Sequence, residues 1–277
     1  MREQFLDVEG IATRCLVAGD DKAPLLILLH GLTLTSEVWI RNIDELGKSF
    51  RVVAVDLLGH GFTQPRTAQP VGLEEKLLHL EALVASHGLA GASISGSSFG
   101  GLIAANLVLR GRCRIRKLVI NGSGSAFNTE DQLAAFMRHI REQYGSSLGT
   151  SSPEDWKRRV SASVYDPATI PQELPDALAA CYAQPWAVAC WKATVDVMQA
   201  PERFRPFRIL DRLEQLNLPT LVVWGRNDRG GIYESAVTAV KRMPDASLVA
   251  FDQCAHLPML EHPTRYNDTI RDFLAAP

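Results

Sequence analysis

A serine acts as a nucleophile towards a carbonyl group only when a neighbouring base takes its proton and an acid orients that base. Ser98 stands in a setting suited to this chemistry, because residues 96–100 read Gly-Ser-Ser-Phe-Gly and fit the pattern G-x-S-x-G. That pattern is typical of a nucleophile elbow, a strained turn from a strand into a helix that exposes the serine above the sheet edge. A glycine- and serine-rich loop fits the same residues, so the interpretation depends on the elements on either side.

The candidate acid and base follow later in the chain. Asp228 and His256 each come a few residues after a short apolar run that predicts a buried strand. Active sites of open α/β sheets assemble in loops beyond the carboxyl ends of parallel strands, so we expect both side chains near Ser98. Asp252 is the alternative acid, but a residue so close to His256 along a strand end rarely approaches it in the needed geometry.

The other histidines near these motifs fit structural roles better than catalytic ones. His30 and His60 lie in glycine-containing turns and precede Asp228 in the chain. His262 stands where the last helix is predicted to begin, which favours a surface or capping role.

The elements that must position these residues alternate between strands and helices. Residues 5–17 alternate apolar and polar side chains around Gly10, which predicts an antiparallel hairpin at a sheet edge. Residues 35–39 look like a capped helix start. The later alternation predicts right-handed crossovers and a parallel sheet. The expected strands are 23–29, 51–55, a run ending at the elbow, 117–121, 219–224 and 247–251, and the expected helices are 73–87, 102–109, 233–242 and 264–274.

The strand pattern stops between about residues 125 and 212. This segment reads as short helices interrupted by prolines. A structureless loop of that length would be unusual in a compact domain, so we predict an inserted helical cap. The predicted organisation is an α/β core of residues 1–124 and 213–277 with a helical cap, or lid, of residues 125–212.

Composition narrows the range of partners. The 277 residues carry a formal net charge of −2, are 46% hydrophobic and include five cysteines. No basic excess is present to neutralise nucleic-acid phosphates or to bind an anionic membrane, and no apolar run is long enough to span one. The scattered cysteines lack disulfide or zinc-site spacing, which favours a reducing, cytoplasmic location. We expect a small-molecule substrate, and a homo-oligomer is compatible with the sequence.

Taken jointly, the motifs resemble the α/β-hydrolase superfamily along essentially the whole chain. The resemblance implies a mostly parallel sheet flanked by helices, with an inserted cap and a catalytic triad of Ser98, Asp228 and His256. In this family the commonest alternative position of the catalytic acid is the loop that corresponds to residues 122–129. That loop contains no Asp or Glu here, which favours Asp228 as the acid. The motifs are the elbow, His30-Gly31 with Trp39 eight residues on, the turn at 56–61, the segment 224–228 and His256-x-Pro258.

The oxyanion formed during attack needs hydrogen-bond donors aimed at it. By the geometry of the elbow, one donor is the backbone N–H of Phe99. The family resemblance implies that the backbone N–H of Leu32 is the other. His256 then takes the proton of Ser98, an acyl-enzyme forms and water hydrolyses it, with no metal and no organic cofactor.

The substrate class depends on finer features. The elbow, the segment 224–228 and the stretch 165–174 look like the meta-cleavage-product hydrolases, which split carbon–carbon bonds. Three features differ: residues 32–34 replace a glycine-rich loop, residues 174–185 offer no Arg or Lys for a substrate carboxylate, and Leu257 replaces a tryptophan. We therefore expect a small, largely apolar ester, thioester or lactone, with carbon–carbon bond hydrolysis as the alternative.

Trp186, Trp191 and Leu257 are the candidate substrate-binding residues beneath the cap. For the two tryptophans, packing within the cap is the alternative role. Two functions of other classes also occur on this fold, a ligand-binding receptor and a cofactor-free oxygenase. The intact set of Ser98, Asp228 and His256 argues against a purely binding role.

Overall fold

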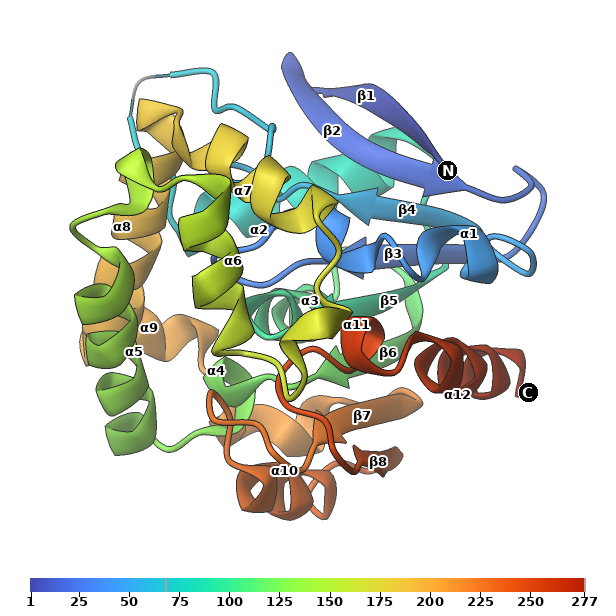
Figure 1. The fold of residues 1–277 in the computed structure, drawn as a ribbon. Helices are drawn as coiled ribbons and strands as arrows, with labels where there is room; N and C mark the ends of the chain where they lie inside the picture. Colours follow the sequence, from blue (N-terminus) through green and yellow to red (C-terminus); the bar gives the residue numbers. More distant parts are fainter. Residues whose placement is uncertain (68, 277) are drawn as a thin grey trace.

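An eight-stranded sheet forms the centre of the molecule (Figure 1). The computed structural model describes residues 1–67 and 69–276. The strands are β1 (Arg2–Val8), β2 (Ile11–Ala18), β3 (Leu25–Leu29), β4 (Arg51–Val55), β5 (Ala92–Ser97), β6 (Ile115–Asn121), β7 (Thr220–Gly225) and β8 (Ala246–Phe251). Their order across the sheet is β1-β2-β4-β3-β5-β6-β7-β8. The pairs β1–β2 and β2–β4 are antiparallel, and all later pairs are parallel.

Helices flank this sheet, as the predicted α/β-hydrolase fold class requires. They are α1 (Ile43–Leu46), α2 (Leu73–Ser86), α3 (Phe99–Arg110), α4 (Gly124–Phe127), α5 (Glu130–Tyr144), α6 (Pro153–Ser161), α7 (Glu173–Tyr182), α8 (Pro185–Gln199), α9 (Pro201–Phe204), α10 (Tyr233–Val240), α11 (Pro258–Glu261) and α12 (Pro263–Ala275). Short 3-10 helices include η1 (Ser36–Trp39), η2 (Leu148–Thr150), η3 (Pro167–Thr169), η4 (Arg205–Phe207) and η5 (Leu210–Gln215).

The central strands are apolar on both faces because helices cover both sides of the sheet. Residues 26–29 of β3 and residues 52–55 of β4 are all buried. The parallel pairing of these strands and the antiparallel β1–β2 hairpin confirm the sequence prediction. The strand β6 begins at Ile115, two residues before its predicted start.

The prediction of a capped helix start at residues 35–39 is wrong in detail. Residues 36–39 form η1, which is a short 3-10 helix. Thr35 has an extended backbone, and its side chain makes no capping hydrogen bond. The N–H of Ser36 instead donates to Asp56 Oδ1 at 2.9 Å. Asp56 Oδ2 accepts from the buried guanidinium of Arg14 at 3.0 Å. A buried carboxylate, rather than a local cap, therefore orders the start of this turn.

Residues 124–215, all of them described, contain helices and turns but no strand. The side chain of Thr129 caps α5 by accepting a hydrogen bond from the N–H of Gln132. The side chain of Ser152 caps α6 by accepting one from the N–H of Asp155. Figure 1 shows α5 to α8 gathered beyond the end of the sheet at which the arrow of β4 points. This arrangement brings the helical segment over the carboxyl ends of the parallel strands. The exact core and cap boundaries stay a prediction.

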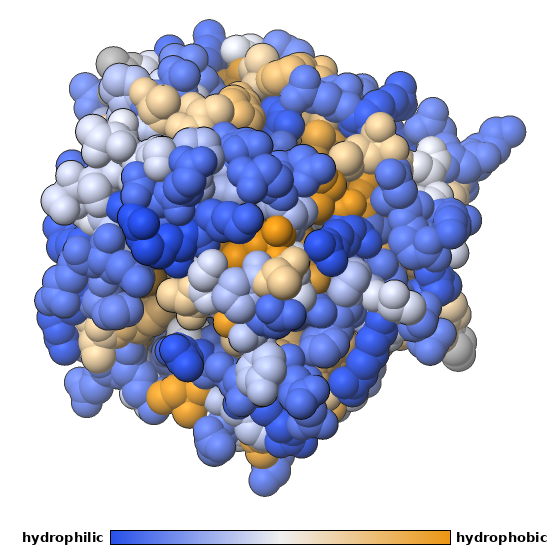
Figure 2. Space-filling model, viewed as in Figure 1, coloured by the Kyte–Doolittle hydropathy of each residue, from blue (hydrophilic) through white to orange (hydrophobic). Residues whose placement is uncertain are grey.

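The molecular surface is mainly polar on the face drawn in Figure 2, where hydrophobic side chains appear only in small areas. Among the helices described, none has both the length and the apolar character needed to cross a membrane. All five cysteines are free thiols, and four of them are buried. The cytoplasmic location inferred from the cysteines stays a prediction.

Candidate active site

The turn at Ser98 has the geometry expected of an elbow. β5 ends at Ser97, α3 begins at Phe99, and Ser98 between them has φ 52° and ψ −117°. A positive φ is strained for a residue with a side chain, and such strain concentrates at functional sites. The N–H of Ser98 donates to the carbonyl of Asn121 at 2.7 Å, which ties the turn to the end of the neighbouring strand.

The glycines on either side of Ser98 are required by close backbone contact. A Cβ atom at Gly96 would lie 2.2 Å from the carbonyl oxygen of Gly100, and one at Gly100 would lie 2.5 Å from that of Leu29. Both distances are far below van der Waals contact, so any side chain at these positions would push the helix away from the sheet. The two flanking glycines therefore allow the close approach of strand and helix at this turn.

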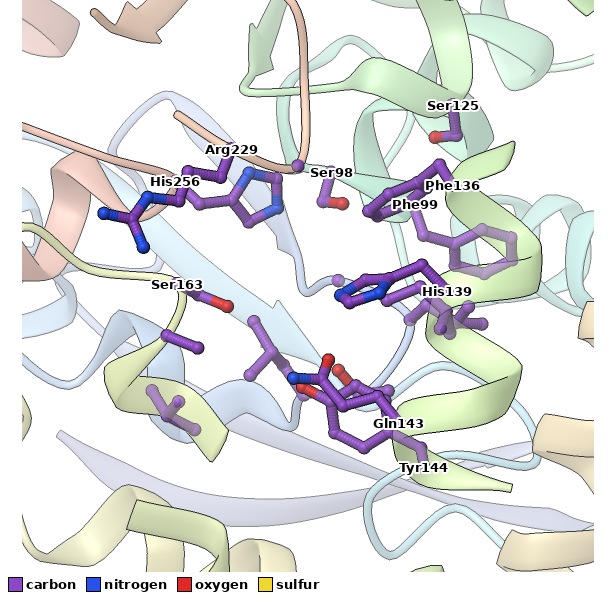
Figure 3. Close-up of a pocket in the computed structure, with 18 of the residues that line it drawn as sticks. Ser98, Phe99, Ser125, Phe136, His139, Gln143, Tyr144, Ser163, Arg229 and His256 are labelled. Atoms are coloured by element: carbon purple, nitrogen blue, oxygen red, sulfur yellow. The ribbon is translucent and has the colours of Figure 1, made fainter. Parts of the chain in front are cut away.

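Asp228 and His256 are joined by a hydrogen bond. His256 Nδ1 lies 2.8 Å from Asp228 Oδ2. The Asp228 side chain is fully buried and that of His256 is 14% exposed. Asp228 Oδ1 accepts the N–H groups of Gly230 at 2.7 Å and Gly231 at 3.2 Å, which fixes the carboxylate. Figure 3 shows the imidazole of His256 pointing towards Ser98.

The electrostatic surroundings of His256 favour its protonated form. Burial lowers the pKa of His256, but the charge of Asp228, its hydrogen bond and the charge of Glu261 together raise the pKa above its ordinary value. An imidazole in this setting gains stabilisation when it accepts a proton. The arrangement therefore suits a general base that becomes an imidazolium during the reaction.

The alternative residues are engaged elsewhere. Asp252 is exposed and pairs with Arg226 at 2.8 Å, so it does not orient His256. His30 is buried; its Nδ1 lies 2.8 Å from the carbonyl oxygen of Gly31, and its Nε2 accepts the N–H of Leu57 at 3.1 Å. His60 is buried against the rings of His30 and Phe99, and His262 Nε2 contacts the carbonyl of Gln253 at 3.0 Å. These contacts are structural.

Glu261 is a buried residue that the sequence reasoning missed. Its carboxylate accepts the N–H groups of Ala255 and Leu257, both at 3.0 Å, and these two residues flank His256. It also accepts the N–H of Tyr165 at 2.6 Å. The N–H of His256 in turn donates to the carbonyl of Ser163 at 3.0 Å. Glu261 therefore holds the histidine loop and ties it to the segment between α6 and α7.

Two backbone N–H groups stand free beside the serine. Among residues 1–67 and 69–276, neither the N–H of Leu32 nor that of Phe99 donates a hydrogen bond to another residue. Both residues line the same cavity as Ser98. The carbonyl of Leu32 accepts from the hydroxyl of Tyr182 at 3.3 Å, which links this loop to α7. Two free donors near a serine are the arrangement that an oxyanion needs.

A cavity of about 360 Å³ lies over Ser98 and His256. This volume is in the range of small-molecule sites. Figure 3 shows His139 and Gln143 projecting from α5 into the cavity, opposite Ser163. The rest of its lining is largely apolar and includes Leu34, Phe136, Met137, Ile140, Tyr144, Trp156, Val160, Met198 and Leu257.

Only one of the three predicted substrate-binding residues lines the cavity. Leu257 lines the cavity, but Trp186 and Trp191 do not. Trp191 is fully buried, with its ring centroid 6.4 Å from that of Tyr144, and Trp186 is partly buried against the hydrophobic core. Both tryptophans therefore take the alternative role of packing among the helices. Trp156 is the tryptophan that reaches the cavity.

The charge of the cavity also differs from the sequence expectation. Residues 174–185 contribute nothing to its lining, so the lack of Arg and Lys there does not determine its charge. Arg229, in the loop after β7, does line it, although its guanidinium points away from Ser98 in Figure 3. His139 is a second group that can carry positive charge. Neither position was recognisable from spacing, because each faces the cavity only through the tertiary arrangement.

Comparison with known proteins identifies the family. Residues 26–269 match the model of the alpha/beta hydrolase family, and the chain belongs to that family. The match spans β3 to α12 and includes Ser98, Asp228 and His256.

Three similar proteins indicate the range of activities among its relatives. The chain is 25% identical over 268 residues to the 2-hydroxy-6-oxononadienedioate/2-hydroxy-6-oxononatrienedioate hydrolase 1 of Dechloromonas aromatica, covering 90% of this chain and 86% of that protein. It is 27% identical over 252 residues to the pimeloyl-[acyl-carrier protein] methyl ester esterase of Nitrosomonas europaea, covering 88% and 92%. The solved structure of 2-hydroxy-6-oxo-6-phenylhexa-2,4-dienoate hydrolase from Rhodococcus sp. strain RHA1 superposes with a TM-score of 0.81 over 99% of both chains at 24% identity.

Proposed function

We propose that this protein is a serine hydrolase that cleaves a small, largely apolar carboxylic ester, thioester or lactone through an acyl-enzyme on Ser98. The observation that carries the proposal is the 2.8 Å contact between Asp228 and His256, whose imidazole points towards a serine on a strained elbow. The mainly apolar lining of the cavity supports an apolar acyl group. The similarity to a methyl ester esterase supports ester chemistry.

The mechanism follows from the roles of these groups. The ring nitrogen Nε2 of His256 takes the proton of Ser98 Oγ, and Oγ forms a bond to the carbonyl carbon. The N–H groups of Leu32 and Phe99 stabilise the negative charge that develops on the carbonyl oxygen. The tetrahedral intermediate then expels the alcohol, thiol or lactone hydroxyl, which receives the proton from His256. Water, activated by the same imidazole, releases the acid.

A second candidate function is hydrolysis of a carbon–carbon bond in a meta-cleavage-type product of aromatic ring breakdown. Arg229 favours it, because an arginine that lines the cavity is able to bind the carboxylate of such a substrate. The names of the relatives from Dechloromonas and Rhodococcus favour it as well. The same serine and histidine serve either reaction, so the two candidates differ in what the cavity selects.

The experiment compares labelling and turnover in the same preparations. Wild-type protein, Ser98→Ala and Ser97→Ala are treated with a fluorophosphonate probe, and each is assayed with p-nitrophenyl butyrate and with a 2-hydroxy-6-oxo-dienoate. Ser97 is the matched control, because its hydroxyl is buried and has no hydrogen-bond partner among the described residues. We expect Ser98→Ala to lose kcat/KM by about 10⁴-fold or more.

The outcomes separate the candidate functions. Ester turnover with labelling at Ser98 supports the first proposal, and preferential turnover of the dienoate supports the second. Labelling at Ser98 with neither turnover would favour a ligand-binding receptor, and oxygen consumption without hydrolysis would favour a cofactor-free oxygenase. Full activity of Ser98→Ala would refute both hydrolase proposals.

A further inference from the structure

A second cleft lies beside the cavity that contains Ser98. It has a volume of about 340 Å³ and is formed by α5, the end of α8, α9 and the segment that follows. Its inner part is lined by Leu133, Ala134 and Phe204. Its outer part carries five charged residues, Glu130, Glu202, Arg205, Arg208 and Asp211.

Met198 belongs to the lining of both spaces. It lies between Val197 and Gln199 at the end of α8, and the residue as a whole is 3% exposed. On the facing helix α5, Met137 lines the first space and Leu133 the second. These two residues are four positions apart and therefore lie on one face of the helix, one turn from each other. The two spaces are therefore neighbours along α5, and Met198 lies at the border that they share.

The side chain of a methionine changes conformation readily. Its side chain is unbranched, has three rotatable bonds and adapts to irregular spaces at low cost. A change of rotamer at Met198 moves a side chain that borders both spaces. No other residue lines both of them among the residues described.

We propose that the second cleft is a distal subsite for the acyl group, and that Met198 is the residue that sets how long this group can be. The inference rests on the proposed ester hydrolysis at Ser98. An acyl chain that passes Met198 first meets the apolar surface of Leu133 and Phe204. Its end then reaches the charged outer part, so the subsite takes long acyl chains and accepts a polar terminal group.

The charges of the outer part are consistent with a polar group rather than a strongly anionic one. Arg208 pairs with Asp211 at 3.0 Å and with Glu130 at 3.9 Å. Arg205 pairs with Glu202 at 3.1 Å. Since both arginines already face carboxylates, neither offers an unopposed positive charge. A hydroxyl or amide at the end of the chain finds donors and acceptors there without displacing these pairs.

The test measures kcat/KM for p-nitrophenyl esters with acyl chains from acetyl to dodecanoyl. The readout is the ratio of the long-chain to the butyryl value. Met198→Ala removes most of the side chain that borders both spaces and is expected to raise this ratio about tenfold. Met198→Trp adds volume at the same border and is expected to lower the ratio by a similar factor. Met243→Ala is the matched control, because Met243 is buried but lines neither space.

A second pair of variants distinguishes the distal cleft from a merely larger inner cavity. Ala134 lines the second cleft alone, and its neighbour Ala135 is exposed and lines neither space. In the Met198→Ala background, Ala134→Trp is expected to abolish the gain for long chains, and Ala135→Trp is expected to preserve it. Thermal unfolding of each variant confirms that it is folded.

The failures of the two proposals are distinguishable. Normal butyrate turnover with a chain-length ratio unchanged in Met198→Ala and Met198→Trp would overturn the distal subsite. A raised ratio that survives Ala134→Trp would also overturn it, because the chain would then occupy the inner cavity. Absence of ester turnover and of fluorophosphonate labelling in the wild-type protein would instead refute the proposed function.

Discussion

Replacement of Glu261 by glutamine tests whether this buried carboxylate positions His256, the proposed general base. The carboxylate accepts the N–H groups of Tyr165, Ala255 and Leu257. A glutamine of the same shape has one oxygen acceptor, and its NH₂ group faces at least one of these N–H donors. The variant therefore leaves a buried N–H group without a partner.

The expected effects follow from these contacts. Loss of a hydrogen bond to a buried charged acceptor destabilises the fold by about 2–4 kcal/mol. For a chain of this length, this lowers Tm by about 5–15 °C. A displaced imidazole lowers kcat by about 10²-fold with little change in KM. The charge of Glu261 also raises the pKa of His256, so the acid limb of the rate profile moves to lower pH.

The assay combines thermal unfolding with pH profiles of kcat/KM on a p-nitrophenyl ester. Glu234→Gln is the matched control, because Glu234 lies exposed on α10 and its carboxylate has no hydrogen-bond partner among the described residues. The reasoning would be refuted if Glu261→Gln kept the Tm, the kcat and the acid limb of the control. If Glu261→Gln lowered the Tm but left kcat and the acid limb of the pH profile unchanged, the role of Glu261 would be structural only.

Three further substitutions probe the same site. Asp228→Asn is expected to lower kcat/KM on the order of 10³–10⁴-fold. The residual activity should have its acid limb at lower pH, since the charge and hydrogen bond of Asp228 raise the pKa of His256. Gly122→Ala introduces a Cβ atom 3.4 Å from both His256 Nδ1 and Asp228 Oδ2 at a φ of +54°, so steady-state kinetics should show a lower kcat. Gly100→Ala puts a Cβ atom 2.5 Å from the carbonyl oxygen of Leu29, and denaturant titration should show a loss of about 3 kcal/mol.

The framework of the site was predictable because it depends on local patterns. The run at β3 is apolar throughout, since both faces of a parallel strand are buried. The elbow at Ser98 is bounded by glycines whose absence of side chains the packing requires. The positions of Asp228 and His256 after strands β7 and β8 predicted their proximity, and the hydrogen bond between them confirms it.

The cavity was less predictable because its lining depends on how the helices pack. The spacing of Phe136, Met137 and Ile140 on α5 predicts a buried helix face, but a face on a core and a face on a cavity have the same pattern. Trp156 and Trp191 illustrate the difference. Both are buried, yet only Trp156 lines the cavity.

Glu261 was missed for a related reason. A glutamate in a short segment near a helix start is ordinarily exposed. Here the short helix α11 places the Glu261 carboxylate against the loop that carries His256. The backbone N–H groups of Ala255 and Leu257 donate to this carboxylate and compensate for the burial of its charge. Nothing in the local pattern of residues 254–262 indicates that return.

The most direct test of the central claim is to trap the acyl-enzyme during turnover. Wild-type protein is mixed with p-nitrophenyl butyrate, quenched in acid within milliseconds and digested, and the peptide that contains Ser98 is analysed by mass spectrometry. We expect a butyryl group on Ser98 whose amount rises in a burst together with p-nitrophenol. Active enzyme that carries no acyl group at any time, or carries it on another residue, would contradict the proposed mechanism.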